Sequence, residues 1–238
     1  RVTDLRRAAL TDPLTGLGNR RALETHLPLG DYSLISLDLD QFKAVNDTFG
    51  HPCGDKLLRI VAERLRGLVG DADTIARMGG DEFVIVQAVI ADPAEATSLA
   101  QGVIDALSEP YDIDGQQAVI GVSIGISVGP GDGSNPDKLL RNADLALYRA
   151  KSDGRGTFRF FEPVMDLQMQ TRRVIEQDLR KALPAGEFEL HYQPVVNLAS
   201  KEISGFEALI RWNHPSKGMI SPADFIPLAE QLGFIVPL

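Results

Sequence analysis

Apolar residues recur along the chain with two periods, one typical of strands and one typical of helices. A nearly continuous apolar run over Tyr32–Asp40 predicts a strand, and a stripe of apolar residues within Gly54–Leu68 predicts an amphipathic helix. Two more helices are expected to begin at Asp92-Pro93 and Asn135-Pro136, where a capping residue precedes proline, and to end near Leu107 and Ser152. The other elements predicted up to residue 162 are helices over Arg20–His26 and Gln41–Asp47, a hairpin of Thr74–Arg77 with Glu82–Ala88, a hairpin of Tyr111–Ile113 with Gln117–Val128, and a closing strand over Thr157–Phe161.

The order of these elements predicts the fold class and the domain limits. Strands that alternate with helices, joined partly by antiparallel hairpins, favour an α+β fold with a central, mostly antiparallel sheet flanked by helices. We expect an incoming helix over residues 1–10, a first domain over residues 11–162 and a linker helix over residues 163–183. Residues 184–238 hold two predicted strands, Phe188–Val195 and Ile203–Trp212, and a helix over Pro222–Gly233. These are too few elements for an independent core, so we interpret them as part of a second α/β domain.

Composition narrows the function classes. The 238 residues are 44% hydrophobic, enough for a core without disulfides, and the single cysteine suits a reducing compartment. The formal charge of −9 argues against binding a nucleic acid polymer, because such affinity depends on many Lys and Arg contacts to phosphates. No apolar run approaches the ~20 residues that a membrane span needs. We therefore expect a cytoplasmic location, with any membrane anchor of a parent protein in a segment not present in this sequence.

Acidic residues mark a candidate site. Gly79-Gly80 predicts a tight turn between two strands, Asp81-Glu82 follows it directly, and Asp38 lies near the end of the strand Tyr32–Asp40. If the two strands are neighbours, three carboxylates converge, and oxygen ligands without Cys or His favour Mg²⁺. Such a site suggests phosphoryl or nucleotidyl transfer. The alternative is an ordinary solvated turn, which the segment Arg77–Phe83 taken alone favours.

Positive side chains for phosphate binding are less clearly marked. Lys43, Lys151 and Arg155 are candidates, but Lys151 and Arg155 stand four residues apart at a predicted helix end. There they could simply complement the helix dipole, and spacing alone favours that interpretation.

Polar residues around the turn after the first strand could read a base. Asn46 and Asp55 could hydrogen-bond a base edge, or they could cap the neighbouring helices, which spacing alone favours. His51 could touch a phosphate, although a lone His before Pro is more often structural. No P-loop, zinc-protease motif or dinucleotide fingerprint occurs, so a nucleotide enzyme here would need another design.

Five motifs occur in order and together resemble one family. They are Asp12-Pro13-Leu14-Thr15-Gly16-Leu17, Asp38-Leu39-Asp40-Gln41-Phe42-Lys43, Asn46-Asp47-Thr48-Phe49-Gly50-His51, Gly79-Gly80-Asp81-Glu82-Phe83 and Ala150-Lys151-Ser152-Asp153-Gly154-Arg155. Over roughly residues 10–162 the chain thereby resembles the GGDEF family, the diguanylate cyclases. The resemblance implies a palm-like fold related to nucleotide cyclases and polymerases. It also implies condensation of two GTP into cyclic di-GMP, with release of pyrophosphate.

The resemblance also implies residue roles and partners. Asp38, the Leu39 carbonyl and Asp81 would bind Mg²⁺ or Mn²⁺ with help from Glu82, and Asp81 would favour loss of the ribose 3′-hydroxyl proton. Residues implied in substrate binding are Asn46 and Asp55 at guanine with His51 nearby, Phe42, Lys43, Lys151 and Arg155 at the phosphates, and Gly79 and Gly80 beside the nucleotide. The two-fold symmetric product implies a homodimer, and the incoming helix implies an upstream sensory domain.

The second part of the chain resembles the start of an EAL domain, the cyclic di-GMP phosphodiesterase family. The residues that carry this resemblance are Tyr192-Gln193-Pro194-Val195-Val196, Glu207-Ala208-Leu209-Ile210-Arg211-Trp212 and Ser221-Pro222-Ala223-Asp224-Phe225-Ile226-Pro227. Glu207 would be a metal ligand, and Gln193 and Arg211 would line the site. The family's other metal ligands lie further on, so phosphodiesterase activity is not expected of this chain alone.

Two points stay open at this level. Many GGDEF proteins carry an Arg-x-x-Asp product-inhibition site, but this chain has Gly70-Asp71-Ala72-Asp73 at that place, which predicts weak or absent inhibition. The leading hypothesis is an active cyclase. The alternatives are a silent GTP-binding domain that regulates the adjacent EAL domain and, least favoured, a scaffold with an inactive site.

Overall fold

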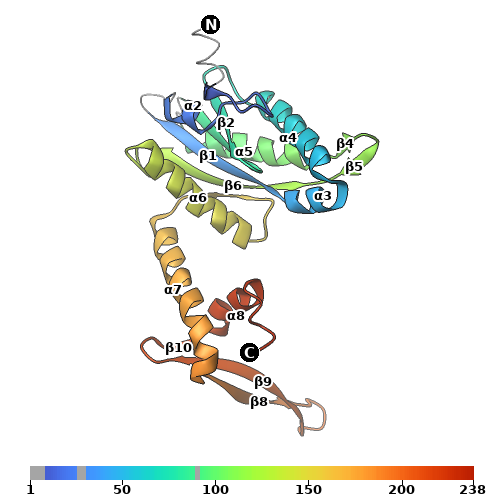
Figure 1. Ribbon diagram of the computed structural model, residues 1–238. Helices are drawn as coiled ribbons and strands as arrows, with labels where there is room; N and C mark the ends of the chain where they lie inside the picture. Colours follow the sequence, from blue (N-terminus) through green and yellow to red (C-terminus); the bar gives the residue numbers. More distant parts are fainter. Residues whose placement is uncertain (1–8, 26–30, 89–91) are drawn as a thin grey trace. The chain divides into compact units, whose positions relative to one another are not determined.

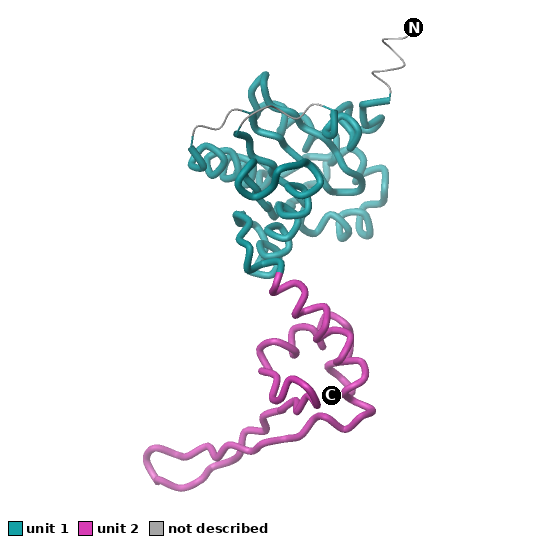
Figure 2. The backbone as a smooth tube through the Cα atoms, turned by 90° about the vertical axis from the view of Figure 1, so that its left-hand side faces the viewer, with its two compact units in different colours: residues 1–166 teal, residues 167–238 magenta. Residues whose placement is uncertain are grey.

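The computed structural model describes residues 9–25, 31–88 and 92–238, which divide into two compact units, residues 1–166 and 167–238 (Figures 1 and 2). Two expected features lie partly outside the described residues. They are most of the incoming helix expected over residues 1–10 and the last residue of the helix expected to end at His26. No helix in the described part of the chain has the length and apolar character that crossing a membrane requires.

The first unit is built on a five-stranded sheet with helices on both faces (Figure 1). Its strand order is β2-β3-β1-β6-β7; β7 runs parallel to β6, and the other neighbours are antiparallel. A separate small hairpin pairs β4 with β5. The bounds are α2 Arg20–Thr25, β1 Tyr32–Asp40, α3 Phe42–Phe49, α4 His51–Arg66, β2 Thr74–Gly79, β3 Glu82–Ala88, α5 Pro93–Ser108, β4 Tyr111–Ile113, β5 Gln116–Ala118, β6 Gly121–Gly129, α6 Pro136–Ser152 and β7 Phe158–Phe160.

Alternation along β1 separates the two faces of this sheet, because successive side chains of a strand point to opposite sides. The odd-numbered residues Ile35, Leu37 and Leu39 join a core with the buried stripes of α4 and α5. The even-numbered residues Tyr32 and Leu34 pack instead with α2 and with Leu139 and Ala143 of α6. Further along β1, the face that looks toward α6 changes from apolar to acidic, and this end of the strand carries the candidate site.

Most predicted elements of this unit are confirmed, including the starts of α2, α5 and α6. Asn19 accepts hydrogen bonds from the backbone of Arg21 and Ala22, and Asp92 and Asn135 cap α5 and α6 in the same way. Two predictions were wrong. Helix α4 begins at His51 and not at Gly54, because Pro52 is well suited to a first helical turn. The strand expected over Gln117–Val128 is interrupted, and its two parts belong to different sheets.

The second unit contains a three-stranded antiparallel sheet, in the order β10-β9-β8, and a core around Trp212 and Phe225. Residues of α7, among them Ile175 and Leu179, complete this core, so residues 184–238 do not form it alone. The indole Nε1 of Trp212 donates a hydrogen bond to Glu187, which satisfies the one polar atom of that buried ring. The bounds are α7 Pro163–Ala185, which begins in the first unit, β8 Phe188–Val196, β9 Ile203–His214, β10 Gly218–Ile220 and α8 Pro222–Gln231. The predicted strands and helix of this part are therefore confirmed, apart from shifts at their ends.

Close contact between α6 and the sheet depends on Gly125 of β6. A Cβ atom there would lie 2.0 Å from the Ala143 carbonyl oxygen and 2.2 Å from the Leu147 nitrogen. Gly125→Ala is therefore expected to destabilise the protein by about 1–3 kcal/mol, the usual cost of overpacking. Denaturant unfolding measures this. In the control Gly102→Ala, the added Cβ meets no heavy atom within 4 Å on α5, so stability should stay equal or rise. Equal stability of both variants would contradict this packing.

Candidate functional site

The structure brings Asp38 next to the acidic turn. Strand β1 pairs with β3 so that Asp38 is directly opposite Glu82, and the Leu39 amide donates a 3.3 Å hydrogen bond to the Asp81 carbonyl. Directly opposed residues of an antiparallel pair project to the same face. Asp38 and Glu82 therefore stand side by side on the face that looks toward α6, and Asp81 is in the turn immediately before β3. The convergence expected from the sequence is what the sheet register produces.

The glycine turn beside these acids is open. Gly79 and Gly80 have φ values of 143° and 54°, which glycine adopts readily, and an added Cβ at either would meet no heavy atom within 4 Å. Arg77 fixes the turn from behind, because its Nε and Nη2 atoms donate hydrogen bonds of 3.0 and 2.7 Å to the Gly80 carbonyl. The backbone is thus held in place, while its outer side stays free for a ligand.

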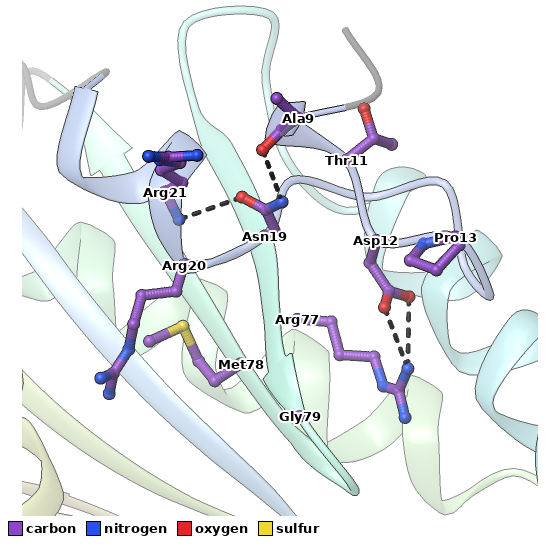
Figure 3. A pocket seen from close by; sticks show the side chains of 10 residues that line it. All are labelled: Ala9, Thr11, Asp12, Pro13, Asn19, Arg20, Arg21, Arg77, Met78 and Gly79. Carbon is purple, nitrogen blue, oxygen red and sulfur yellow. Dashed lines mark hydrogen bonds and ion pairs between the residues drawn. The ribbon is translucent and has the colours of Figure 1, made fainter. Parts of the chain in front are cut away.

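Arg77 also ties this turn to the segment that precedes α2. Its Nη1 atom lies 3.1 Å from a carboxylate oxygen of Asp12, with both side chains largely buried (Figure 3). Burial raises the pKa of Asp12, but hydrogen bonds from Thr15 and the charge of Arg77 outweigh burial and leave that pKa below its usual value. Figure 3 shows this pair beside an open pocket of about 440 Å³ that Met78 and Gly79 also border. Asp12 and Arg77 both lie in segments singled out from the sequence, but their pairing could not be predicted from it.

Burial and mutual repulsion disfavour the ionised forms of the clustered carboxylates. Burial raises the pKa of Asp38, and the charges of Asp81 and Asp40 raise it further. The hydrogen bond and charge of Lys151 act in the opposite direction and lower this pKa. Burial likewise raises the pKa of Glu82, with further contributions from the charges of Asp38 and Asp144. Mutual repulsion of this kind is relieved by a divalent cation. The donor set of carboxylates and a backbone carbonyl fits Mg²⁺ or Mn²⁺.

The described residues contain no ready-made metal site of three or more His, Cys, Asp or Glu side chains. Lys151 stands at this place instead, with its Nζ atom 2.6 Å from Asp38 Oδ2. A magnesium site of this type usually uses one or two carboxylates and is completed by water and substrate phosphates. The arrangement therefore fits an ion that arrives with a nucleotide better than one that the protein holds permanently.

A fourth acid, which the sequence analysis missed, stands on α6. The Ser36 hydroxyl donates a 2.8 Å hydrogen bond to Asp144 Oδ1, and burial raises the pKa of this carboxyl. Asp144 precedes Lys151 by seven residues, which is two helical turns, so both project from one face of α6 toward β1. That spacing was a usable signal, but it is informative only once α6 is known to cover β1.

Arg155 lies beyond the helix whose dipole it was thought to complement. Helix α6 ends at Ser152, so of these two cations only Lys151 belongs to its last turn. The favoured interpretation of both as helix-end cations was therefore wrong for Arg155. The Arg155 Nε atom is 3.9 Å from Asp40 Oδ1, and 61% of its side chain is exposed. Lys151 and Arg155 thus both approach the acidic end of β1.

The residues predicted to read a base lie on α3 and α4, and the capping interpretation is wrong for both. Gly50 occupies the C-cap of α3 and the N-cap of α4, and neither Asn46 nor Asp55 makes a capping side-chain hydrogen bond. The Asn46 side chain lies over Gly54, where an added Cβ would be 2.0 Å from its Oδ1 atom. Within the described residues, the side-chain polar groups of Asn46 and Asp55 make no protein hydrogen bond, so they are available to a ligand.

The other predicted contacts near this turn differ in exposure. His51 and Lys43 are exposed, whereas the Phe42 side chain is buried in the core against Gly54. Only the backbone of Phe42 can therefore meet a ligand. In the second unit, β8 and β9 pair with Gln193 opposite Glu207, and Arg211 follows Glu207 by four residues on the same strand face. The three polar residues predicted for that fragment thus share one face of the sheet.

Comparisons with known proteins agree with these observations. The family profile described as "Diguanylate cyclase, GGDEF domain" matches residues 9–157, and the one described as "EAL domain" matches residues 176–238. The chain is 43% identical over 244 residues to the bifunctional diguanylate cyclase/cyclic di-GMP phosphodiesterase MucR of Pseudomonas aeruginosa, covering 99% of this chain and 36% of that protein. It is 40% identical over 240 residues to the cyclic di-GMP phosphodiesterase NbdA of the same organism, covering 97% and 30%. The chain thus spans about a third of the length of these relatives.

Solved structures agree for the first unit. The GGDEF domain of TpbB, also called YfiN, from Pseudomonas aeruginosa superposes with a TM-score of 0.64 at 34% identity, covering 67% of this chain and 99% of that one. The coiled coil and GGDEF domain of DgcB from Caulobacter crescentus, in complex with c-di-GMP, superpose with a TM-score of 0.58 at 30% identity, covering 67% and 88%.

Proposed function

The chain belongs to the GGDEF family, with part of an EAL domain after it, and from this we propose that it is a diguanylate cyclase that joins two GTP molecules into cyclic di-GMP. In each of two steps, a ribose 3′-oxygen attacks the α-phosphorus of the other nucleotide, the bond to the β-phosphate breaks, and pyrophosphate leaves. The observation that carries the proposal is Asp38 beside the Asp81-Glu82 turn, next to two glycines with free space above them.

The acids fit the metal-dependent part of this chemistry. Asp38, the Leu39 carbonyl and Asp81 would hold Mg²⁺ or Mn²⁺, with Glu82 assisting. When bound, such an ion would make the 3′-hydroxyl more acidic and would stabilise the pyrophosphate leaving group. Asp81, which is in the turn and only partly buried, would favour loss of the hydroxyl proton.

The remaining residues would bind and orient GTP. Asn46 and Asp55 present unpaired polar groups for the guanine edge, with exposed His51 nearby. The phosphates would meet the Phe42 backbone and the side chains of Lys43, Lys151 and Arg155. Two copies of the chain are required, because the product is two-fold symmetric and one site of this size supplies the contacts for one GTP. We further propose the division into a cyclase domain at residues 11–162 and a linker helix at residues 163–183.

A turnover assay tests this proposal. The chain is incubated with GTP and Mg²⁺ at concentrations that include those at which it dimerises, and cyclic di-GMP is measured by chromatography. A second candidate, a silent GTP-binding domain that regulates an EAL phosphodiesterase, is favoured by relatives such as NbdA that are named only as phosphodiesterases. Saturable GTP binding without product at every concentration would establish this second candidate and reject the cyclase.

Product inhibition is expected to be weak or absent in this chain. Asp73 of the degenerate Arg-x-x-Asp segment accepts 2.9 Å hydrogen bonds from the backbone of Gly70 and Ala88, and Gly70 stands where the arginine would be. Adding cyclic di-GMP should therefore leave the initial rate unchanged. In the variant Gly70→Arg, whose Cβ meets nothing closer than 3.6 Å, inhibition should appear. Tight inhibition of the natural sequence that Asp73→Ala removes would contradict this prediction.

A further inference from the structure

Asp40, two residues after Asp38 on the same face of β1, makes contacts that the proposed reaction does not yet use. Its side chain is buried, with a residue exposure of 6%. It accepts hydrogen bonds of 2.9 and 3.0 Å from the Ser123 hydroxyl and one of 3.1 Å from the Gly156 amide. A buried carboxylate needs such donors to keep its charge. The groups that hydrogen-bond Asp40 are all donors, and the Arg155 Nε atom lies 3.9 Å away. The carboxylate of Asp38, on the same strand face, is a like charge that interacts with Asp40.

The Gly156 amide belongs to the loop that connects α6 with β7 and carries Arg155. Arg155 has a φ of 65°, a left-handed conformation that is strained for a residue with a side chain. Such a conformation persists only where the surroundings hold it. Other contacts hold the loop from outside: Asp153 accepts hydrogen bonds from Arg149 and Arg159, and the Arg155 amide donates to the Ala150 carbonyl at 3.2 Å.

Asp40 is the contact that holds the inner side of this loop. It binds the residue directly after Arg155 and lies near one edge of the Arg155 guanidinium. The rest of that guanidinium stays exposed, in keeping with the 61% exposure of the side chain. A guanidinium held by one edge can present its remaining N–H groups to a phosphate, which is the geometry that phosphate recognition by arginine uses.

We propose that Asp40 is a positioning residue for phosphate binding, and not a metal ligand, because it holds loop 153–156 in the conformation that presents Arg155. Both of its oxygens already accept hydrogen bonds from the protein, unlike those of Asp81. Its effect on the reaction is exerted through Arg155. The role in GTP binding rests on the proposed cyclase function, whereas the role in ordering the loop does not.

Hydrogen–deuterium exchange in the nucleotide-free chain tests the structural part without any need for activity. Asp40→Ala should raise the exchange rate of the peptide that covers residues 153–157 by about tenfold or more, and Asp40→Asn, which keeps one acceptor oxygen, should raise it less. The control Asp71→Asn changes an exposed acid of the first unit and should leave that peptide unchanged. Unchanged exchange in both Asp40 variants would overturn the proposal. If Asp40→Ala does not fold, Gly156→Ala replaces it as the test: the change strains a φ of 57° at the residue whose amide binds Asp40, its added Cβ meets no heavy atom within 4 Å, and it should loosen the same peptide.

Kinetics test the functional part. Asp40→Asn should raise KM for GTP by about tenfold, in the range typical of outer supporting residues, with the Mg²⁺ concentration for half-maximal rate unchanged. In an Arg155→Ala background, Asp40→Asn should change KM less than about threefold, because residues that act as a unit are not additive. A raised Mg²⁺ requirement with unchanged KM would show a metal ligand instead, and fully multiplicative effects would show that Asp40 does not act through Arg155. If the unmodified chain makes no cyclic di-GMP, the proposed function fails, and the exchange experiment still decides whether Asp40 orders the loop.

Discussion

Asp81→Asn is expected to lower the rate of cyclic di-GMP formation by about 10³-fold or more while leaving the fold intact. A bound divalent ion contributes several kcal/mol to such reactions, and each 1.4 kcal/mol corresponds to a factor of ten in rate. Asp81 stands in the turn after Gly80, only partly buried, and within the described residues its side chain makes no protein hydrogen bond. Under the proposed function, replacing one oxygen by an amide would therefore remove a metal ligand and a proton acceptor without breaking a structural contact.

The stability of the metal-free protein separates a catalytic role for Asp81 from a structural one. The Asp81 charge raises the pKa of both Asp38 and Glu82, so it opposes their ionised forms. Removing that charge should lower both pKa values and leave the unfolding temperature at neutral pH equal or higher. The control Asp71→Asn should change neither rate nor stability, because Asp71 is exposed in a turn away from the site. Full activity of Asp81→Asn would show that Asp81 is not a metal ligand. Unfolding of the variant would show that Asp81 has a structural role.

The sequence predicted the acidic centre because its geometry depends on local rules. Alternation along Tyr32–Asp40 placed Asp38 and Asp40 on one face, and the glycine turn set the register of β3 against β2. Only the pairing of β1 with β3 had to be assumed, and the observed register places Asp38 opposite Glu82. The family motifs then supplied roles that spacing alone could not assign.

Other parts of the site depend on packing between elements that lie far apart in the sequence. Asp144 reaches Ser36, 108 residues earlier, because Gly125 lets α6 approach the sheet closely. Asp40 likewise accepts a hydrogen bond from Gly156, which follows it by 116 residues. The Asp40–Gly156 contact leaves no periodic signal in the sequence, and the seven-residue spacing of Asp144 and Lys151 is informative only once α6 is known to cover β1. The capping interpretation of Asn46 and Asp55 was wrong because Gly50 alone ends one helix and begins the next, so that both polar side chains are left unpaired.

Lys151→Met should lower kcat/KM for GTP by about 10- to 100-fold, because a charged hydrogen bond is worth about 1.5–3 kcal/mol. The structure shows the Lys151 ammonium 2.6 Å from Asp38, with 31% of its side chain exposed. It therefore pairs with an acid in the free protein, and under the proposed function it would meet a phosphate when the nucleotide enters. The control Lys138→Met makes the same change at an exposed position near the start of α6 and should have no effect. If Lys151 only complemented the helix dipole, kcat/KM for GTP would stay unchanged in both variants.

The pH profile of Lys151→Met adds a second, independent readout. Burial raises the pKa of Asp38, and Lys151 lowers it by its hydrogen bond and charge, so the variant should have a still higher Asp38 pKa. Because the proposed metal site needs the carboxylate form, activity is expected to fall as pH decreases through that pKa. The acid side of the profile should therefore move to higher pH in the variant and stay in place for Lys138→Met. Initial rates at saturating Mg²⁺ across pH 5 to 8 measure this shift; an unmoved acid limb would mean that Lys151 does not control the charge of Asp38 during turnover.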